Sequence, residues 1–368
     1  MEHTTFSTVV GHAPIQNRIL TAIKSNRLPH AYLFYGNEGT GKDAMAIEVA
    51  KLINCDQGPL HVCGNCTNCK KIANLQHPDI RFIFPIPSSS NVKLEEIGAA
   101  IQQKAENPYR RYHFPKKNVF IGIDTIRDLK NEAKFKLYEG RKKVFIISEA
   151  DEMRPEAANA LLKMLEEPPD NVMLILTTSK IHRLLPTIRS RCQLVHFPKL
   201  PGDFALKVLQ RYLQPPPENL PKILRLAQDN IKLAFDFVEQ DVLEMRNDAV
   251  DFLRKLVLIE KSRDLQEHIN KITDSKDRKA MGLILYFILT WFRDAIQLKM
   301  KSSTSAPLFN EDLQNSVNKF VIAYPNTKYI EAVEQVQIAR SELEDPRNLN
   351  PTLIFTHLAI KLNSLIRK

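Results

Sequence analysis

Residues 36–43, Gly36-Asn-Glu-Gly-Thr-Gly-Lys-Asp43, have the spacing of a phosphate-binding loop, GxxxxGK[ST]. In such a loop the glycines let backbone N–H groups face a phosphate, and the lysine reaches the β- and γ-phosphates. The last position normally carries a hydroxyl that ligates Mg²⁺, but here it is Asp43, whose carboxylate would repel the phosphates. The sequence therefore predicts an intact phosphate loop with a damaged catalytic site. The nucleotide-binding candidates in it are Gly36, Gly39, Gly41, Lys42 and Asp43.

The second half of an ATPase site is an acidic pair after an apolar strand, one residue for Mg²⁺ and one to orient the attacking water. The strand Val144-Phe-Ile-Ile147 is followed by Ser148 and Glu149. Ser148 takes the metal-ligand position, and Glu149 keeps the second one. Two Mg²⁺ ligands are thus altered together, which predicts no intrinsic ATPase and ATP/Mg²⁺ absent or weakly bound. An active ATPase with an unusual metal shell stays open as an alternative.

Four cysteines, Cys55, Cys63, Cys66 and Cys69, follow the spacing C-x7-C-x2-C-x2-C. Four thiolates so close together in a reducing compartment predict a tetrahedral structural Zn²⁺ site, with free thiols or disulfides as the alternative. All four ligand positions are filled, so this zinc would not be catalytic. The fifth cysteine, Cys192, is expected to be a core residue.

The elements that must position these residues alternate between strands and helices over residues 1–200, which predicts a parallel sheet covered on both faces. An insertion at residues 86–117 interrupts this pattern, with one helix and a basic, aromatic segment at 109–115. We interpret it either as a surface elaboration or as a DNA contact. The expected strands are 31–35, 79–84, 143–147, 172–177 and 193–197, and the expected helices are 42–54, 94–106 and 154–166.

Beyond residue 200 the pattern becomes helical, with a small unit at 201–241 and longer amphipathic helices at 242–368. The clearest of these are 278–300, 326–342 and 353–366. The longest apolar run, residues 281–292, is too short to cross a bilayer and favours a buried helix. Periodicity does not separate a self-contained bundle from an oligomerisation collar.

Composition adds little. The chain has 368 residues, 43% of them hydrophobic, and a formal net charge of +10. That charge fits an acidic partner such as DNA or RNA, or simply a mildly basic surface. The N-terminus lacks the pattern of a signal peptide, so a cytoplasmic protein without a membrane segment is expected.

Several motifs together resemble the clamp-loader subunits of bacterial DNA polymerase III. They are residues 28–36 (LPHAYLFYG), the Cys55–Cys69 knuckle, residues 159–169 (NALLKMLEEPP), Thr177-Thr178 and Ser190-Arg191-Cys192. The resemblance is strong over about residues 5–200 and rests on architecture beyond them. It implies an AAA+ P-loop domain at 1–200 with an inserted zinc knuckle at 55–69, a helical lid at 201–241, and an all-helical collar at 242–368. The collars of this family form a ring of five subunits.

The family has active ATPase subunits, gamma or tau, and a degenerate one, delta prime, and Asp43 and Ser148 make the chain similar to the degenerate branch. The resemblance implies a non-hydrolysing subunit that supports ATP-driven loading of the sliding clamp on primed DNA. The implied partners are gamma/tau and delta. Arg191 matches the arginine that reaches in trans to the ATP of a neighbouring subunit, although a lone arginine there is ordinarily a surface charge. Lys232 falls near a second sensor position, and residues 10–12 resemble the adenine-side box.

Two further alternatives stay open. One is an active gamma-type ATPase that uses Asp43 or Glu149 for Mg²⁺. The other is a zinc-knuckle nucleic-acid-binding module with a vestigial phosphate loop. The second is weakened by the small flanking charge of the knuckle, which consists of Lys70 and Lys71.

Overall fold

A computed structural model describes residues 6–88, 92–112, 114, 119–240, 242–258, 262–274, 277–300, 308–345 and 347–367. The chain divides into two compact units, with the boundary after Asp236. Each unit is described by itself. The predicted division into three domains, at residues 200 and 241, stays a prediction.

The first unit is built on a five-stranded sheet with the order β2-β3-β4-β1-β5, in which every pairing is parallel. The three central strands β3, β4 and β1 are buried almost along their whole length, as expected for a parallel sheet covered on both faces. The predicted fold class is therefore confirmed. The strands are β1 (Ala31–Gly36), β2 (Ile80–Ile83), β3 (Lys143–Ile147), β4 (Val172–Thr178) and β5 (Gln193–Phe197).

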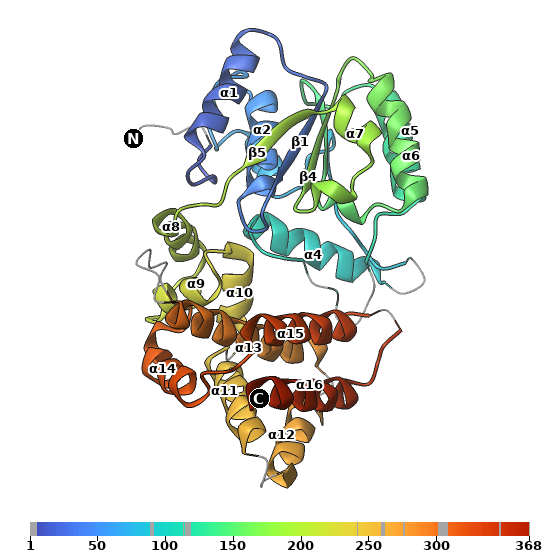
Figure 1. Cartoon of the computed structure of the whole chain (residues 1–368). Helices are drawn as coiled ribbons and strands as arrows, with labels where there is room; N and C mark the ends of the chain where they lie inside the picture. Colours follow the sequence, from blue (N-terminus) through green and yellow to red (C-terminus); the bar gives the residue numbers. More distant parts are fainter. Residues whose placement is uncertain are drawn as a thin grey trace. The chain divides into compact units, whose positions relative to one another are not determined.

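Helices cover both faces of this sheet (Figure 1). On one side lie α1 (Ala13–Lys24) and α2 (Lys42–Asn54), and every residue of α2 is buried. On the other side α5 (Ile123–Lys134), α6 (Pro155–Glu166) and α7 (Pro186–Arg191) form a continuous apolar core with the strands. The short helix α3 (Thr67–Ala73) follows the cysteine-rich turn and packs on α2. The 3₁₀ turns are Ala150–Glu152 and Ile181–Arg183 in this unit, and Glu311–Leu313 in the second.

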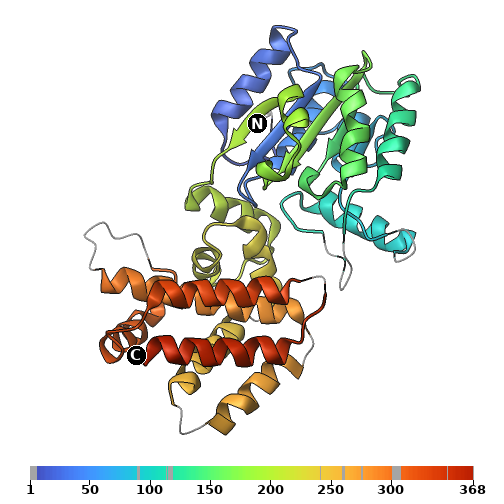
Figure 2. The same cartoon turned by 45° about the vertical axis from the view of Figure 1, so that its right-hand side comes forward.

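The predicted helix of the insertion is confirmed as α4 (Leu94–Glu106), which lies across one end of the sheet (Figures 1 and 2). Its Ala100 joins Phe84, Tyr112 and Phe114 in a small second core. Tyr109 is also buried, at 2% exposure. Of the insertion, residues 89–91, 113 and 115–118 lie outside the described part of the chain. The aromatic rings that a DNA contact would need for stacking therefore face inward at Tyr109, Tyr112 and Phe114.

Three short helices follow the sheet, α8 (Gly202–Tyr212), α9 (Leu220–Leu226) and α10 (Ile231–Glu239). The second unit is helical, as predicted. It consists of α11 (Val242–Val257), α12 (Ser262–Asp274), α13 (Arg278–Lys299), α14 (Gln314–Ala323), α15 (Tyr329–Leu343) and α16 (Pro351–Ile366).

Helix α13 is the centre of this second unit and packs against α11, α14 and α15. By length and composition alone it passes as a membrane span, but 72% of its apolar window is buried inside the structure, which fits a core helix. The final helix begins at Pro351, two residues before its predicted start at residue 353. The side chain of Asn350 accepts hydrogen bonds from the backbone N–H groups of Thr352 and Leu353, and Pro351 occupies the first turn.

Candidate functional site

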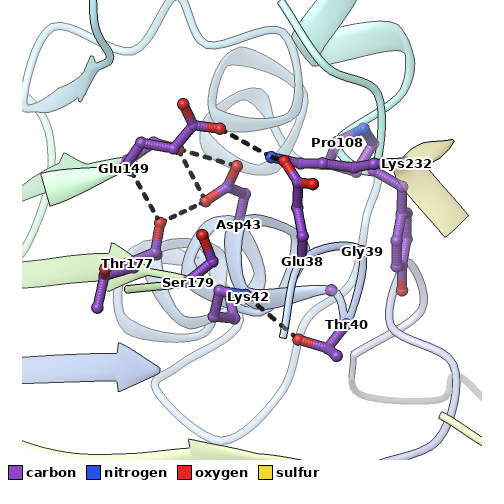
Figure 3. Close-up of a pocket in the computed structure, with 14 residues that line it drawn as sticks. Glu38, Gly39, Thr40, Lys42, Asp43, Pro108, Glu149, Thr177, Ser179 and Lys232 are labelled. Carbon is purple, nitrogen blue, oxygen red and sulfur yellow. Dashed lines mark hydrogen bonds and ion pairs between the residues drawn. The ribbon is translucent and has the colours of Figure 1, made fainter. Parts of the chain in front are cut away.

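The two halves of the predicted nucleotide site meet at one edge of the sheet. Parallel neighbours β3, β4 and β1 all end there, and ligands of open α/β sheets bind outside these carboxyl ends. Strand β1 leads into the phosphate loop, β3 into Ser148 and Glu149, and β4 ends at Thr177 and Thr178. Side chains from all three strand ends converge in Figure 3. The structure therefore brings the predicted residues Gly39, Gly41, Lys42, Asp43, Ser148 and Glu149 together around one cavity.

The carboxylate of Asp43 is buried and fully engaged within the chain. The Ser148 hydroxyl donates to it at 3.0 Å, the Thr177 hydroxyl donates at 2.7 Å, and the Lys104 ammonium lies 2.7 Å from Oδ2. Burial by itself would raise the pKa of Asp43, but the positive charges of Lys104 and Lys232 outweigh it and hold that pKa far below its usual range. Asp43 is thus an ionised group whose cation is a lysine of the insertion.

The phosphate-binding lysine is turned back onto its own loop. Lys42 Nζ donates to the carbonyl of Gly36 at 2.9 Å and to that of Asn37 at 2.6 Å. Burial, together with the nearby positive charge of Lys232, lowers the pKa of Lys42 to about 8. The group that would neutralise a triphosphate is therefore held by backbone carbonyls of its own loop.

The glutamate that would orient the attacking water is also paired. Lys232 Nζ, from α10, lies 2.9 Å from Glu149 Oε1 and 3.8 Å from Glu38 Oε1 (Figure 3). Burial would lower the pKa of Lys232, but these carboxylates outweigh it and raise that pKa above its ordinary value. Lys232, aligned near a sensor position from its sequence, does line the site.

The sequence-based interpretation missed the residues that the insertion contributes, namely Lys104, Tyr109, Arg111 and Tyr112. One signal was available. In α4 the positions of Ile97, Ala100 and Ile101 form an apolar stripe, and Lys104 continues it at helical spacing. A lysine on the apolar stripe of a helix needs a buried partner, because an unpaired internal charge is costly.

Little space is left between these side chains. The remaining cavity, lined by the phosphate loop, Tyr109, Glu149, Thr177 and Lys232, measures about 30 Å³. The enclosed space between these side chains is thus that of about two water molecules.

The four cysteines converge as predicted, with all four sulfur atoms within 4.8 Å of one another. Cys55 Sγ and Cys63 Sγ are 3.6 Å apart. This is close to the edge of a tetrahedron with metal–sulfur bonds of about 2.3 Å, and too long for a disulfide of about 2.05 Å. Backbone N–H groups of Cys63, Cys66 and Cys69 each donate to a sulfur of the cluster. The donor set therefore fits a metal ion held by four thiolates.

Arg191 lies apart from the residues that line the pocket. It ends α7, and its guanidinium lies 2.9 Å from Glu166 Oε1 and donates to the Thr187 carbonyl at 3.1 Å. Its side chain is 36% exposed. Cys192, expected in the core, is buried at 8% exposure. Burial raises the pKa of the Cys192 thiol to about 12, so it is an inert apolar residue.

Comparison with known proteins finds matches over most of the chain. The family described as "DNA polymerase III, delta subunit" matches residues 11–201, and its C-terminal counterpart matches residues 243–364. "DNA polymerase III subunit delta'" of Bacillus subtilis is 27% identical over 95% of both chains. The tau subunit of the same organism is 30% identical over 69% of this chain and 39% of its own length. A solved gamma-subunit-related protein from Thermotoga maritima covers 95% of this chain at 17% identity, with a TM-score of 0.41.

The first family match spans more than half of the chain, and the two matches together include the whole sheet and most of both units. The relatives named above, and a gamma/tau subunit of Mycoplasma pneumoniae that is 31% identical over 64% of this chain and 31% of its own length, are all DNA polymerase III subunits. The chain belongs to the DNA polymerase III delta subunit family, in its delta-prime clamp-loader branch, and is related to gamma/tau.

Proposed function

We propose that this subunit does not hydrolyse ATP and serves as a structural platform in a clamp loader. The observation that carries the proposal is that the groups needed for chemistry already have partners inside the chain. Asp43 is paired with Lys104, Lys42 is bonded to backbone carbonyls, and Glu149 is paired with Lys232. An active gamma-type site would need Asp43 or Glu149 to hold Mg²⁺, and both carboxylates are engaged with ammonium groups. ATP and Mg²⁺ are therefore absent or weakly bound here.

The ATP hydrolysis that this subunit supports would take place in a neighbouring subunit. A guanidinium supplied in trans stabilises charge on a transferring phosphoryl group and is worth about 10³–10⁵-fold in kcat. Arg191 suits that role because it is half-exposed and outside its own pocket. Its ion pair with Glu166 is at the surface, where such pairs contribute only about 0–1 kcal/mol. Turning Arg191 toward the ATP of an adjacent subunit would thus cost little.

The cysteine cluster would hold a structural Zn²⁺ through Cys55, Cys63, Cys66 and Cys69. When bound, the ion joins the end of α2 to α3 through bonds that the apolar core does not provide. The knuckle is also tied to the sheet unit by hydrogen bonds. The Asn68 amide donates to the Asn54 carbonyl at 3.2 Å, and the Arg141 guanidinium donates to the Asp56 carbonyl at 3.2 Å. The role of the metal is therefore to stabilise one local fold.

The relatives are named as subunits of DNA polymerase III, which supports partners of the same kind for this chain. We infer a hetero-oligomeric ring with gamma/tau and delta subunits, in which the helical second unit supplies the collar. The complex would load a sliding clamp on primed DNA in the cytoplasm.

Steady-state ATP hydrolysis tests this function. The purified chain alone should show no turnover above a blank. A loader assembled with gamma/tau, delta, clamp and primed DNA should lose most of the turnover at the site that Arg191 faces when it carries Arg191→Ala. Arg183→Ala, which removes a surface arginine paired with Glu152, is the matched control and should leave turnover unchanged. Robust turnover by the chain alone would overturn the platform role, and an unaffected Arg191→Ala loader would remove the trans arginine.

A further inference from the structure

Residues of the insertion reach both Asp43 and the phosphate loop of the nucleotide site. We propose that its residues 94–112, here called the plug segment, act as a built-in ligand: the Lys104 ammonium takes the place of the metal, and residues 109–112 take the space of the nucleotide. The lid helix α10 is thereby fixed to the phosphate loop without ATP. This inference rests on the proposed non-hydrolysing role and gives it a physical cause.

The metal end of the site already contains a cation of the chain itself. Asp43, Ser148 and Thr177 offer a carboxylate and two hydroxyls at adjacent strand ends, which are the hard oxygen ligands that Mg²⁺ prefers. The cation among them is Lys104, which is 1% exposed and 2.7 Å from Asp43 Oδ2. Two buried charges this close hold each other in place, because either one alone would leave the other unpaired.

Tyr112 completes this end. Its hydroxyl is 2.7 Å from Ser148 Oγ. Ser148 uses its single proton to donate to Asp43, so Tyr112 must be the donor to Ser148. A chain of hydrogen bonds thus runs from the plug segment through Ser148 to Asp43. Burial and the negative charges of Glu149 and Asp43 raise the pKa of Tyr112 well above its usual value, so its proton stays in place.

The nucleotide end is filled by the ring of Tyr109. A Cβ atom built on Gly41 would lie 2.9 Å from Tyr109 Cε1, so the ring rests directly on the phosphate loop. The Tyr109 hydroxyl donates to the Thr8 carbonyl at 3.3 Å and accepts from the Val10 N–H at 3.4 Å. Val10 begins the segment that resembles the adenine-side box. One short segment therefore reaches from the metal position to the far end of the site.

The lid is held by the same segment. Arg111 lies 2.7 Å from Glu38 of the phosphate loop and 3.6 Å from Asp236 of α10. Lys232 of α10 pairs with Glu149 and Glu38 in turn. The start of α10 is close to the loop as well, since a Cβ on Gly39 would lie 2.7 Å from the Ile231 nitrogen. Loop, plug segment and lid thus form one network of alternating charges, in which no external phosphate is needed to connect them.

A double-mutant cycle in the full-length protein tests the substitute cation. Asp43→Asn alone and Lys104→Met alone should each lower the thermal unfolding midpoint, by about 10 °C, because each leaves a buried charge unpaired. The double variant should recover most of that loss. Lys93→Met, at an exposed lysine preceding the same helix, is the control and should change little. If Lys104→Met cannot be purified, recovery of folding in the double variant supports the pair. Additive losses, or a double variant that stays unfolded, would overturn it.

Hydrogen exchange tests the built-in ligand itself. Adding Mg·ATP to the wild-type protein should leave exchange in the phosphate loop and α10 unchanged, whereas Arg111→Ala should speed exchange in α10. Protection of loop and lid by Mg·ATP in the wild type would overturn the proposal. So would an α10 that exchanges no faster in Arg111→Ala. Protection by Mg·ATP would also contradict the weak nucleotide binding of the proposed function. An unchanged α10 in Arg111→Ala would overturn this inference alone, because the absence of ATP turnover and the Arg191 measurement do not depend on it.

Discussion

The two ends of helix α2 carry two ligand sets that differ in one respect. At its C-terminal end Cys55 joins three other thiols that face one another and backbone N–H groups. At its N-terminal end Asp43 joins two hydroxyls and also an ammonium from the same chain. The cysteine set offers ligands for a cation but contains no cation of its own. The Asp43 set offers ligands and also contains the Lys104 ammonium. The comparison teaches that a ligand set requires an external ion only where the chain does not itself supply the opposite charge.

Removing the metal should have the largest effect. A structural Zn²⁺ site provides about 10–16 kcal/mol of binding free energy in isolated zinc-finger peptides. Cys69→Ser should therefore lower the zinc content from about one per chain to near zero and destabilise the knuckle. The measurements are metal analysis by atomic emission and thermal unfolding with and without chelator. Cys192→Ala is the control, because Cys192 is buried outside the cluster, and it should keep its zinc. A wild-type protein without zinc would contradict the claim that the cysteines at the C-terminal end of α2 bind an external ion.

Neutralising Asp43, at the N-terminal end of α2, should lower the stability of the protein by less than loss of the metal. Asp43→Asn should lower the free energy of unfolding by about 3–5 kcal/mol, because Lys104 loses its buried partner. Urea denaturation measures this loss, with the exposed Asp124→Asn as control.

The pH dependence of that loss has a definite sign. Since the folded-state pKa of Asp43 lies below the unfolded value of about 3.9, its contribution is fully present above that value and is lost as the pH falls through the folded pKa. The difference between wild type and Asp43→Asn should be constant from pH 7 to about 5 and shrink below about 4. A difference that shrinks already near pH 6 would mean that Asp43 is not held ionised.

Two glycines test whether the Tyr109 ring lies on the phosphate loop. Gly41 and Gly64 both have positive φ, at 84° and 70°. A Cβ on Gly41 would meet the Tyr109 ring at 2.9 Å, whereas a Cβ on Gly64 would meet nothing within 4 Å. Gly64→Ala should cost about 1–2 kcal/mol of backbone strain, and Gly41→Ala about 1–3 kcal/mol more for the clash. The extra cost should fall in a Tyr109→Leu background. Equal costs at the two glycines would mean that no ring lies on the phosphate loop.

The smallest effect is expected at Arg191. Its pair with Glu166 is at the surface, so Arg191→Ala should change the free energy of unfolding by only about 0.5 kcal/mol. Chemical denaturation checks this value. A loss above about 2 kcal/mol would show that the guanidinium is needed to hold its own fold and is not free to turn to a neighbour.

The sequence predicts the metal cluster well because its ligands are neighbours in the chain. Four cysteines within one short segment can meet in few ways, and the spacing alone indicates the tetrahedral set. The phosphate loop is predicted for the same reason, because the strand before it and the helix after it are its neighbours in the sequence. The helix of the insertion was likewise predicted with its observed bounds, Leu94–Glu106, from local periodicity.

The partner of that helix could not be predicted in this way. Lys104 and Asp43 are far apart in the sequence, and only the parallel sheet and its crossovers bring them together. The charged and aromatic segment after α4 looks solvent-exposed from its composition, yet Tyr109 and Tyr112 are buried. Composition reports what a segment contains, whereas its burial depends on distant elements that cover it. The sequence thus indicates an altered metal site, and the structure adds the Lys104 ammonium beside Asp43, which local patterns do not predict.

The most direct test of the central claim is the equilibrium binding of Mg·ATP to the purified full-length protein, measured by calorimetry beside an active gamma/tau subunit. The account predicts no saturable binding at millimolar ATP, because the plug segment already occupies the site. Stoichiometric binding in the micromolar range would contradict it, since the segment would then have to leave a site that we describe as permanently filled.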